Sequence, residues 1–481
     1  MSSARSTQPR GLLVAVLGGA ALALALAPAR ASAQEELRLM NEPTSFTDVI
    51  DAFDEGDAFD LNVHVGFRRS RVAGTIQREV NDAGAASGRA ADGFRDVGDW
   101  EHVRNVLELG VDVGLFRDVA LFGRLPLVLR DEREVLRSGS AAEVDPLLVE
   151  RTPGAAGDPQ LFYLPYQSAT RSGVSTVELG LAANLFNQGR RPSFPTWMML
   201  FALELGIGDI MTPCTDGGVV QRDPGTGEPL VDAMGDPVPN QDCDGGVSEG
   251  THAFRFESRL SRRYRHAEVY SGLMFRFPWA GRAEDAFSPA GSLAGYQNTR
   301  PPIRGSLSAG VALVPWENRE TWQRFSVDLR GKATYVSEGR DYSPLFDALG
   351  TSQSPYLTDT QPEGYDASGN QVGRQVAFNG LTDVQAHGEI GGTLAVEMQA
   401  ARYVRFRFGA NVMYVTPHLL TATDGCNPNA SPEGDDDPRA GSCTEGLLNP
   451  AHRPVIDTPG QRFRLDGAVS FDLFVQAAAQ F

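Results

Sequence analysis

The end of the chain carries the pattern that most limits its fold. From Phe463 to Phe481 every odd-numbered residue is apolar or Gly, while most even-numbered residues are polar. Successive side chains of a β-strand point to opposite faces, so this segment predicts a strand with one apolar and one polar face. Strands of globular proteins usually run about five or six residues, whereas a strand that crosses a membrane needs ~9–11 tilted residues. The length of the alternation therefore predicts a membrane-crossing strand.

The same alternation recurs along the chain. Glu108, Asp112, Glu178 and Glu204 each fall on the polar face of a segment whose other face is Leu, Val, Phe or Met. A buried soluble sheet would seldom place acids so regularly on its second face. Counting these segments predicts an all-β fold, a twelve-stranded antiparallel transmembrane β-barrel, with strands near 59–68, 105–116, 119–130, 174–186, 196–208, 251–262, 266–278, 303–315, 324–337, 382–399, 402–416 and 463–481. An even number is typical of a closed bacterial barrel.

The predicted connections alternate between short and long. Short links follow strands two, four, six, eight and ten, and long links, including residues 69–104, follow the odd-numbered strands. Short periplasmic turns and long extracellular loops are typical of outer-membrane barrels. Pro126 has no backbone N–H to donate, so a bulge is expected in the third strand.

The amino terminus predicts export. Arg5 and Arg10 precede an uncharged stretch over 11–27, and Ala31-Ser32-Ala33 has the form of a cleavage site. We interpret residues 1–33 as a signal peptide. The alternative is a signal anchor, because seventeen uncharged residues approach the ~20 that span a bilayer.

Residues 34–58 form a separate segment between the signal peptide and the barrel, which occupies 59–481. Ser45 is a candidate helix cap, and Phe46, Val49, Ile50 and Phe53 would share one helical face. This short amino-terminal helix could lie inside the barrel as a plug or remain in the periplasm. The sequence leaves both alternatives open.

Composition excludes other classes. The net charge is −18, and removal of residues 1–33 takes away three Arg and no acid, which leaves 40 basic and 61 acidic residues. So acidic a chain argues against nucleic acid as a partner. Beyond Ala33 no stretch of about eighteen apolar residues occurs, which argues against membrane helices.

The four Cys fall in pairs within two predicted extracellular loops: Cys214 with Cys243, and Cys426 with Cys443. In an exported protein we expect two disulfides within these loops, each worth ~3–4 kcal/mol in the chain-entropy model. A metal site lacks the usual Cys and His spacing. The same loops hold Asp242, Asp244 and 435–437, but a calcium loop with an acidic twelfth position is missing, so solvated acidic loops are the preferred interpretation.

The chain resembles the large class of Gram-negative outer-membrane β-barrels over almost all of its mature length. The alternating last strand that ends in Phe481 resembles the signal that the barrel assembly machinery of that class recognises. Residues 203–209, Leu-Glu-Leu-Gly-Ile-Gly-Asp before a long loop, are similar to porin-like transporters of aromatic compounds, although that family has Pro-Thr-Gly-Asp at the end. The resemblance implies the cell outer membrane as the location. It implies lipid, lipopolysaccharide, the assembly machinery and a small-molecule solute as partners.

Inward-facing charges are the candidate functional residues. The predicted pore-lining residues are Glu108, Asp112, Arg124, Glu178, Glu204, Arg255, Arg259, Arg276, Arg304, Arg330, Lys332, His387, Glu389, Arg405 and Arg407. Acids dominate the first five strands and bases the next six, so unpaired charges would give a field across the lumen, whereas pairing would fill the interior.

Three functions remain open at this point. The first is a narrow porin-like channel for small solutes, and the second is a non-conducting barrel whose long loops bind a surface ligand or partner. The third, less favoured, is a barrel hydrolase in which His387 and Glu389 meet a serine. No cofactor is expected.

Overall fold

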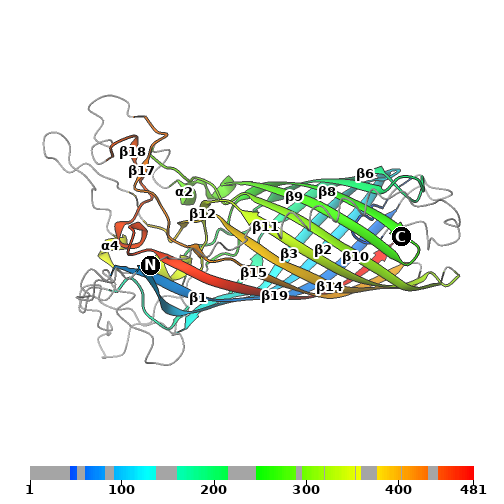
Figure 1. Ribbon diagram of the computed structural model, residues 1–481, viewed down its shortest axis with the longest axis horizontal. Helices are drawn as coiled ribbons and strands as arrows, with labels where there is room; N and C mark the ends of the chain where they lie inside the picture. Colours follow the sequence, from blue (N-terminus) through cyan, green and yellow to red (C-terminus); the bar gives the residue numbers. More distant parts are fainter. Residues whose placement is uncertain are drawn as a thin grey trace, which may run out of the picture.

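The computed structural model shows one tilted-strand barrel with loop segments gathered at one end (Figure 1). The structure describes residues 44–50, 52, 60–81, 92–136, 160–214, 245–288, 295–318, 320–352, 354–358, 376, 378–401, 403–431 and 443–480. The predicted signal peptide, Phe53 and Phe481 lie outside these residues. None of the helices in the described part of the chain is long and apolar enough to span a bilayer.

Twelve long strands in the described residues form the wall. They are β1 (Leu61–Asn81), β2 (Asp92–Phe116), β3 (Val119–Leu136), β6 (Val177–Phe186), β7 (Thr196–Leu205), β8 (His252–Tyr264), β9 (Ala267–Trp279), β10 (Arg304–Asn318), β11 (Gln323–Val336), β14 (His387–Ala401), β15 (Val404–Val415) and β19 (Phe463–Gln480). Each is antiparallel to its neighbours, and β1 pairs with β19 to close the barrel. The predicted fold class is confirmed.

Shorter elements decorate this wall. Strands β4 (Tyr166–Gln167), β5 (Arg171–Val174) and β16 (His418–Leu419) join the barrel sheet, while β12 (Gly339–Asp341) pairs with β13 (Thr382–Val384) and β17 (Cys426–Asn427) with β18 (Leu447–Leu448). The helices are η3 (Gly281–Ala283), α2 (Glu284–Phe287), α3 (Phe346–Gly350), α4 (Pro355–Thr358) and α5 (Pro454–Asp457).

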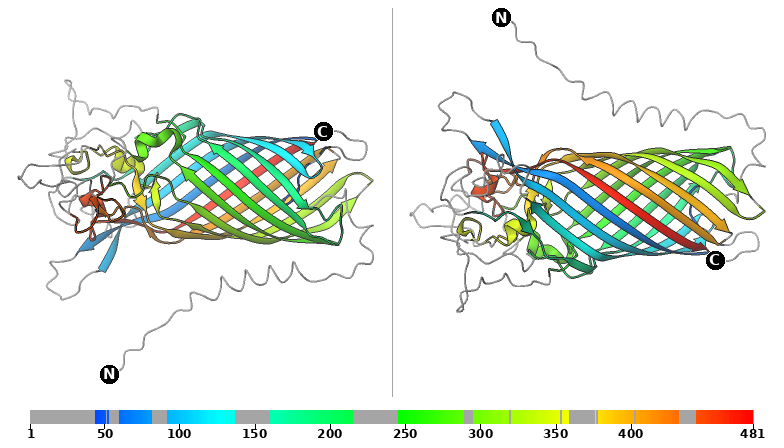
Figure 2. Two further views of the ribbon diagram at one scale, coloured as in Figure 1. Left: turned by 90° about the horizontal axis from the view of Figure 1, so that it is seen from above. Right: turned by 90° about the horizontal axis from the view of Figure 1, so that it is seen from below.

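Strands β1 and β2 correct the predicted first loop. Residues 69–104 were expected to connect two strands, but the structure shows strand on both sides of a connection over 82–91. The long hairpin projects beyond the rim in Figure 2. Its sequence pattern is reversed: Arg69 and Arg71 lie exposed on the outside, whereas Ile76 and Val80 are buried inside. Such a pattern is typical of a sheet that faces water, so a search for lipid-facing strands missed it.

Pro126 lies opposite a break in the neighbouring strand. The predicted fourth strand is split into β5 and β6, and β3 pairs with β6 up to Arg124 and with β5 from Leu127. The missing N–H of Pro126 therefore falls where the partner strand is interrupted. The expected irregularity in β3 is present three residues further on, at Leu129, which is skipped in the pairing with β2.

A folded cap fills the outer mouth of the barrel. It combines α3, α5 and residues around β12, β13 and β16 with the inner faces of the strand ends, and buries a cluster that includes Trp100, Phe162, Leu345, Ile456 and Phe463. At ~25 cal/mol per Å² of buried apolar surface, a cluster of this kind stabilises a fold in water. The outer end is thus built like the core of a soluble protein.

One of the two predicted disulfides lies wholly within the described residues. Cys426 and Cys443 are bonded, with sulfur atoms 2.00 Å apart. Cys214 is also disulfide-bonded, and Cys243, its expected partner, lies outside the described residues. The acidic stretches at 242–244 and 435–437 fall there too.

Candidate functional site

Two cavities lie one above the other inside the barrel. The lower cavity, of about 570 Å³, is nearer the short turns, and the upper cavity, of about 640 Å³, extends toward the cap. Glu108, Arg407 and Gln476 line both cavities, so the two spaces adjoin at these side chains. Each volume is in the range that holds a small molecule.

Of the fifteen predicted pore-lining residues, fourteen line one cavity or both. Those at the lower cavity are Glu108, Asp112, Arg124, Glu178, Glu204, Arg255, Arg259, Arg405 and Arg407. Those at the upper cavity are Glu108, Arg304, Arg330, Lys332, His387, Glu389 and Arg407. Arg276 lines neither, but its Nε donates to Glu204 Oε2 at 2.7 Å, so it also faces inward.

Ion pairs join the acid-rich wall to the base-rich wall. Glu178 on β6 pairs with Arg255 on β8, and Glu204 on β7 pairs with Arg255 and with Arg276 on β9. Opposite charges this close largely cancel one another's field at a distance. The structure therefore supports the pairing alternative over a strong field across the lumen.

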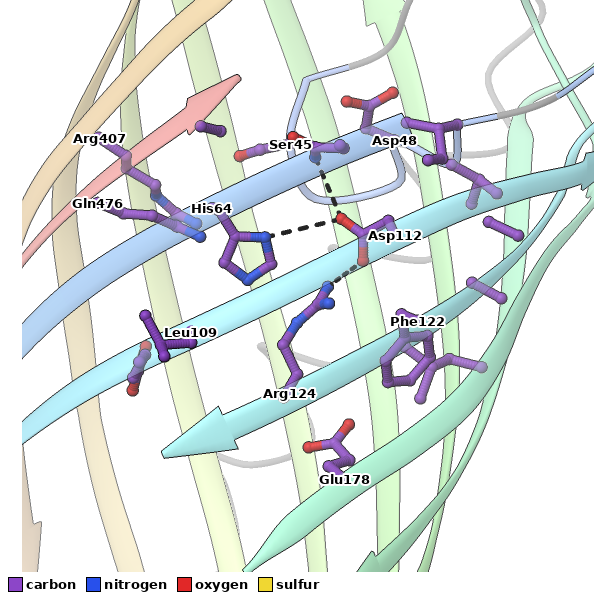
Figure 3. A pocket seen from close by; sticks show the side chains of 18 of the residues that line it. Ser45, Asp48, His64, Leu109, Asp112, Phe122, Arg124, Glu178, Arg407 and Gln476 are labelled. Atoms are coloured by element: carbon purple, nitrogen blue, oxygen red, sulfur yellow. Dashed lines mark hydrogen bonds and ion pairs between the residues drawn. The ribbon is translucent and has the colours of Figure 1, made fainter. Parts of the chain in front are cut away.

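A smaller group surrounds Asp112 on the opposite side of the lower cavity. Asp112 pairs with Arg124, its Oδ2 lies 3.8 Å from His64 Nδ1, and Asn62 Nδ2 donates to Oδ2 at 3.1 Å. Figure 3 shows Ser45 beside this carboxylate. Neither His64 nor Asn62 was among the predicted site residues, because sequence alternation does not rank neutral inward residues.

The amino-terminal segment 44–50, named here the plug segment, occupies the lower lumen. Ser45 to Thr47 form a turn and Asp48 to Ile50 have no regular structure, so these residues do not form the expected helical face. The Thr44 N–H donates to Glu268 Oε2 at 2.8 Å, and the Thr47 hydroxyl lies 2.6 Å from the Ser261 hydroxyl. Of the two alternatives that the sequence left open, the structure shows the plug.

Phe46 is the centre of the plug segment. Its ring stacks on Tyr270 with the centroids 4.1 Å apart, and the guanidinium carbons of Arg330 and Arg259 lie 4.7 and 5.1 Å from its centroid. Rings between cations and another aromatic side chain gain both stacking and cation–π attraction. On the far side, Asp48 accepts a hydrogen bond from Arg405 at 2.8 Å. The base-rich wall thus binds the plug segment.

The upper cavity has a roof made by the cap. Residues 341–344, between β12 and α3, line its upper side. Helix α3 is held by a buried ion pair, since Arg171 Nη1 donates to Asp347 Oδ2 at 3.1 Å and both side chains are at most 3% exposed. Arg171 also donates to the Thr212 carbonyl, next to the disulfide-bonded Cys214. The roof is therefore linked to the loop between β7 and β8.

Burial in the cap shifts three carboxyl groups that lie outside the membrane-spanning strands. It raises the pKa of Asp457 to about 7 and the pKa values of Asp383 and Asp341 to about 6. Asp457 nevertheless accepts hydrogen bonds from the backbone N–H groups of Arg453 and Thr423. These groups make the cap sensitive to pH near neutrality.

The geometry around His387 does not assemble a hydrolase triad. Glu389 pairs with Arg304, and His387 Nδ1 lies 3.0 Å from the Gln385 carbonyl oxygen. Its ring stacks on His418 at 3.8 Å between centroids, and none of the described serine hydroxyls bonds to it. Among the residues that the structure covers, no three His, Cys, Asp or Glu side chains gather as a metal site would need.

The outer surface decides what surrounds the barrel. Leu179, Leu329 and Ile390 are each at least 45% exposed on the outer face of the strands. Trp316 pairs with Phe325 near a short turn, and Tyr335 is exposed ten residues further along β11. Ten residues at ~3.4 Å and ~40° of tilt rise about 26 Å, the height of the apolar band of outer-membrane barrels.

The protein is an outer-membrane β-barrel. Closure gives every strand a hydrogen-bonded neighbour on both sides, which is what a sheet surrounded by lipid requires.

Comparisons with known proteins add no family. No family model matches the chain, and no curated protein matches its sequence. Among solved structures, an outer-membrane channel from Pseudomonas putida F1 is similar at 9% identity and a TM-score of 0.36, covering 92% of this chain and 99% of the channel. A Pseudomonas aeruginosa FadL homologue follows at 9% identity and 0.31, covering 92% and 93%. The outer membrane protease OmpT from Escherichia coli is similar at 6% and 0.26, covering 88% and 96%. Similarities this low assign neither activity nor ligand.

Proposed function

We propose that this barrel is a narrow, porin-like pore through which small solutes pass passively, with the plug segment as its inner gate. The observation that carries the proposal is the pair of adjoining cavities, together more than 1,000 Å³, inside a closed wall. The paired charges leave a polar lining with little net charge, so neutral and dipolar small solutes suit it better than ions of one sign.

The experiment is conductance of the purified barrel in planar lipid bilayers, paired with swelling of liposomes in small sugars and amino acids. We expect small conductance steps, and swelling whose rate falls steeply with solute size. Silence at all voltages, for wild type and for a variant whose plug segment is weakened, would refute the pore.

The cap favours a second function, a closed barrel whose outer surface binds a ligand or partner. A mouth filled by the cluster around Trp100, Leu345 and Phe463 restricts passage, and the long loops begin at the same end. Deleting residues 428–441 between Cys426 and Cys443, with both cysteines changed to Ser, would then abolish binding to lipopolysaccharide or to cells while solute uptake stays unchanged. The reverse result would leave only the pore.

Further proposed partners follow from the class of barrel. Lipid and lipopolysaccharide would cover the apolar outer band, and the assembly machinery would recognise the last strand through Phe481. Replacement of Phe481 by Ser should then lower the amount of folded barrel in cells but leave refolding in detergent unchanged. We also propose that the barrel is not an enzyme, so His387→Ala should leave no hydrolytic activity to lose.

A further inference from the structure

Most charges that line the upper cavity already have an opposite charge beside them. Arg304 lies 3.6 Å from Glu389, and Arg68 lies 3.0 Å from Glu108. Arg330 and Arg407 share a carboxylate oxygen of Asp328, at 3.0 and 3.1 Å. These pairs leave two charged side chains of the cavity to be explained, Lys332 on β11 and Asp472 on β19.

Lys332 is unusual in both sequence and surroundings. It is the only lysine of the chain, in which the other 42 of 43 basic residues are Arg. Among the described residues no carboxylate lies within 4.0 Å of its amine. Its neighbours across β10 and β14 are Ser308 and Gly391, whose small size leaves space around the ammonium group. A compact cation with three donors is thus turned toward an open cavity.

Asp472 faces the same space from another part of the wall. Its Oδ2 accepts a hydrogen bond from Asn411 Nδ2 at 2.9 Å, and Asn411 Oδ1 in turn accepts one from the Thr393 hydroxyl at 3.0 Å. These bonds orient the carboxylate without neutralising it. Within the described residues no cation lies within 4.0 Å of Asp472.

The two charges are placed to act on one molecule. Strands β14 and β15 separate β11 from β19, so the backbones are three steps of ~4.8 Å, or about 14 Å, apart along the curved wall. Both side chains reach inward from that wall and line one cavity of about 640 Å³. A group with a negative end and a positive end can therefore meet both, whereas a simple ion can neutralise only one of them.

We propose that the upper cavity is a binding site for a small zwitterion, with its carboxylate on Lys332 and its ammonium group on Asp472. This inference deepens the proposed pore, on which it rests for access of the solute. Free α-amino acids are the class that combines these two groups in a molecule of suitable size. Each bond would be charge-assisted and so among the stronger hydrogen bonds in water.

The single lysine makes the site directly observable. Reductive ¹³C-methylation of the purified barrel labels Lys332 and the terminal amine, and Lys332→Met identifies which NMR signal is the side chain. The labelled ammonium keeps its positive charge. Glycine, acetate and methylamine are then titrated separately, because they present both groups, only the carboxylate and only the ammonium.

We expect glycine to shift the Lys332 signal saturably, with at least tenfold tighter binding than acetate and no saturable shift from methylamine. Asp472→Asn should lower glycine affinity at least tenfold, to that of acetate. Asp466→Asn is the matched control, because Asp466 lies on the same strand but outside the cavity and should leave affinity unchanged. Equilibrium dialysis of radiolabelled glycine gives the corresponding loss for Lys332→Met, and Lys332→Arg should retain most binding.

Two outcomes would overturn the inference: no saturable shift with glycine, or equal affinity for glycine and acetate. The second would mean a simple anion site. Binding is measured here without conductance, so failure of this site and failure of the pore are separate results. A silent barrel that binds glycine refutes only the pore, and a conducting barrel that ignores glycine refutes only the site.

Discussion

Replacing Phe46 by Ala tests whether the plug segment closes the lumen. The ring is 6% exposed and contacts Tyr270, Arg259 and Arg330. Truncation of a buried Phe typically costs ~3–5 kcal/mol, and the lower figure applies because water can fill the space that the ring leaves in a lumen. About 3 kcal/mol corresponds to roughly a hundredfold shift toward the undocked segment, since 1.4 kcal/mol is tenfold.

Two assays measure this shift. In planar bilayers the open probability of Phe46→Ala should rise by up to about a hundredfold, until it saturates. In detergent, a maleimide should react faster with Val49→Cys by a comparable factor when Phe46→Ala is also present. The contacts of Thr44, Thr47 and Asp48 remain in this variant, so the barrel itself should stay folded.

Phe408→Ala is the matched control for Phe46→Ala. Phe408 is 48% exposed on the outer face of β15, so the same truncation is made where no plug contact exists. If Phe46→Ala and Phe408→Ala behave alike in both assays, the plug segment is not the gate.

Three further predictions concern the cap. Asp347→Ala leaves Arg171 buried without its partner, which typically costs ~3–5 kcal/mol, so α3 should become accessible to protease while barrel strands stay protected. Reduction of Cys426–Cys443 should speed cleavage of that loop, because closing about 17 residues is worth ~3 kcal/mol, and unchanged cleavage would contradict this. Burial raises the pKa of Asp457 to about 7, so this carboxyl stabilises the cap at low pH and loses that contribution as the pH rises through 7. Hydrogen exchange in α5, corrected for intrinsic rates, should be slower at pH 5 than at pH 8, and Asp457→Asn should remove the difference.

The sequence predicted those parts of the fold in which lipid outside and water inside impose a period of two. All twelve strands were found for this reason, with most ends within a few residues of those observed. The outer half of the first hairpin was missed because Arg69 and Arg71 face water there, and the rule that identifies lipid-facing strands does not apply. The residues of the cap likewise follow the rules of a soluble core, which have no fixed period in short loop segments.

For the candidate site, inward charges could be predicted but their partners could not. Which wall Glu178 or Glu204 reaches depends on barrel curvature and side-chain length, and these are not written in the spacing of one strand. Phe46 was recognised as apolar, yet its stacking on Tyr270 joins residues more than two hundred positions apart. The signal for Lys332 was present in the composition, as the single Lys among 43 basic residues.

The reversed pattern of the β1–β2 hairpin has a consequence for how the protein comes apart. Below the point where Arg69 faces outward, the sheet is held by its lipid surroundings, and above it by apolar side chains that exclude water, such as Ile76 and Phe463. Apolar burial in water weakens in urea and on cooling, whereas a lipid-anchored wall is not opposed by the same solvent term. A denaturant series on the barrel in bilayers should therefore show two separate transitions, the first releasing the outer mouth while the embedded cylinder remains intact.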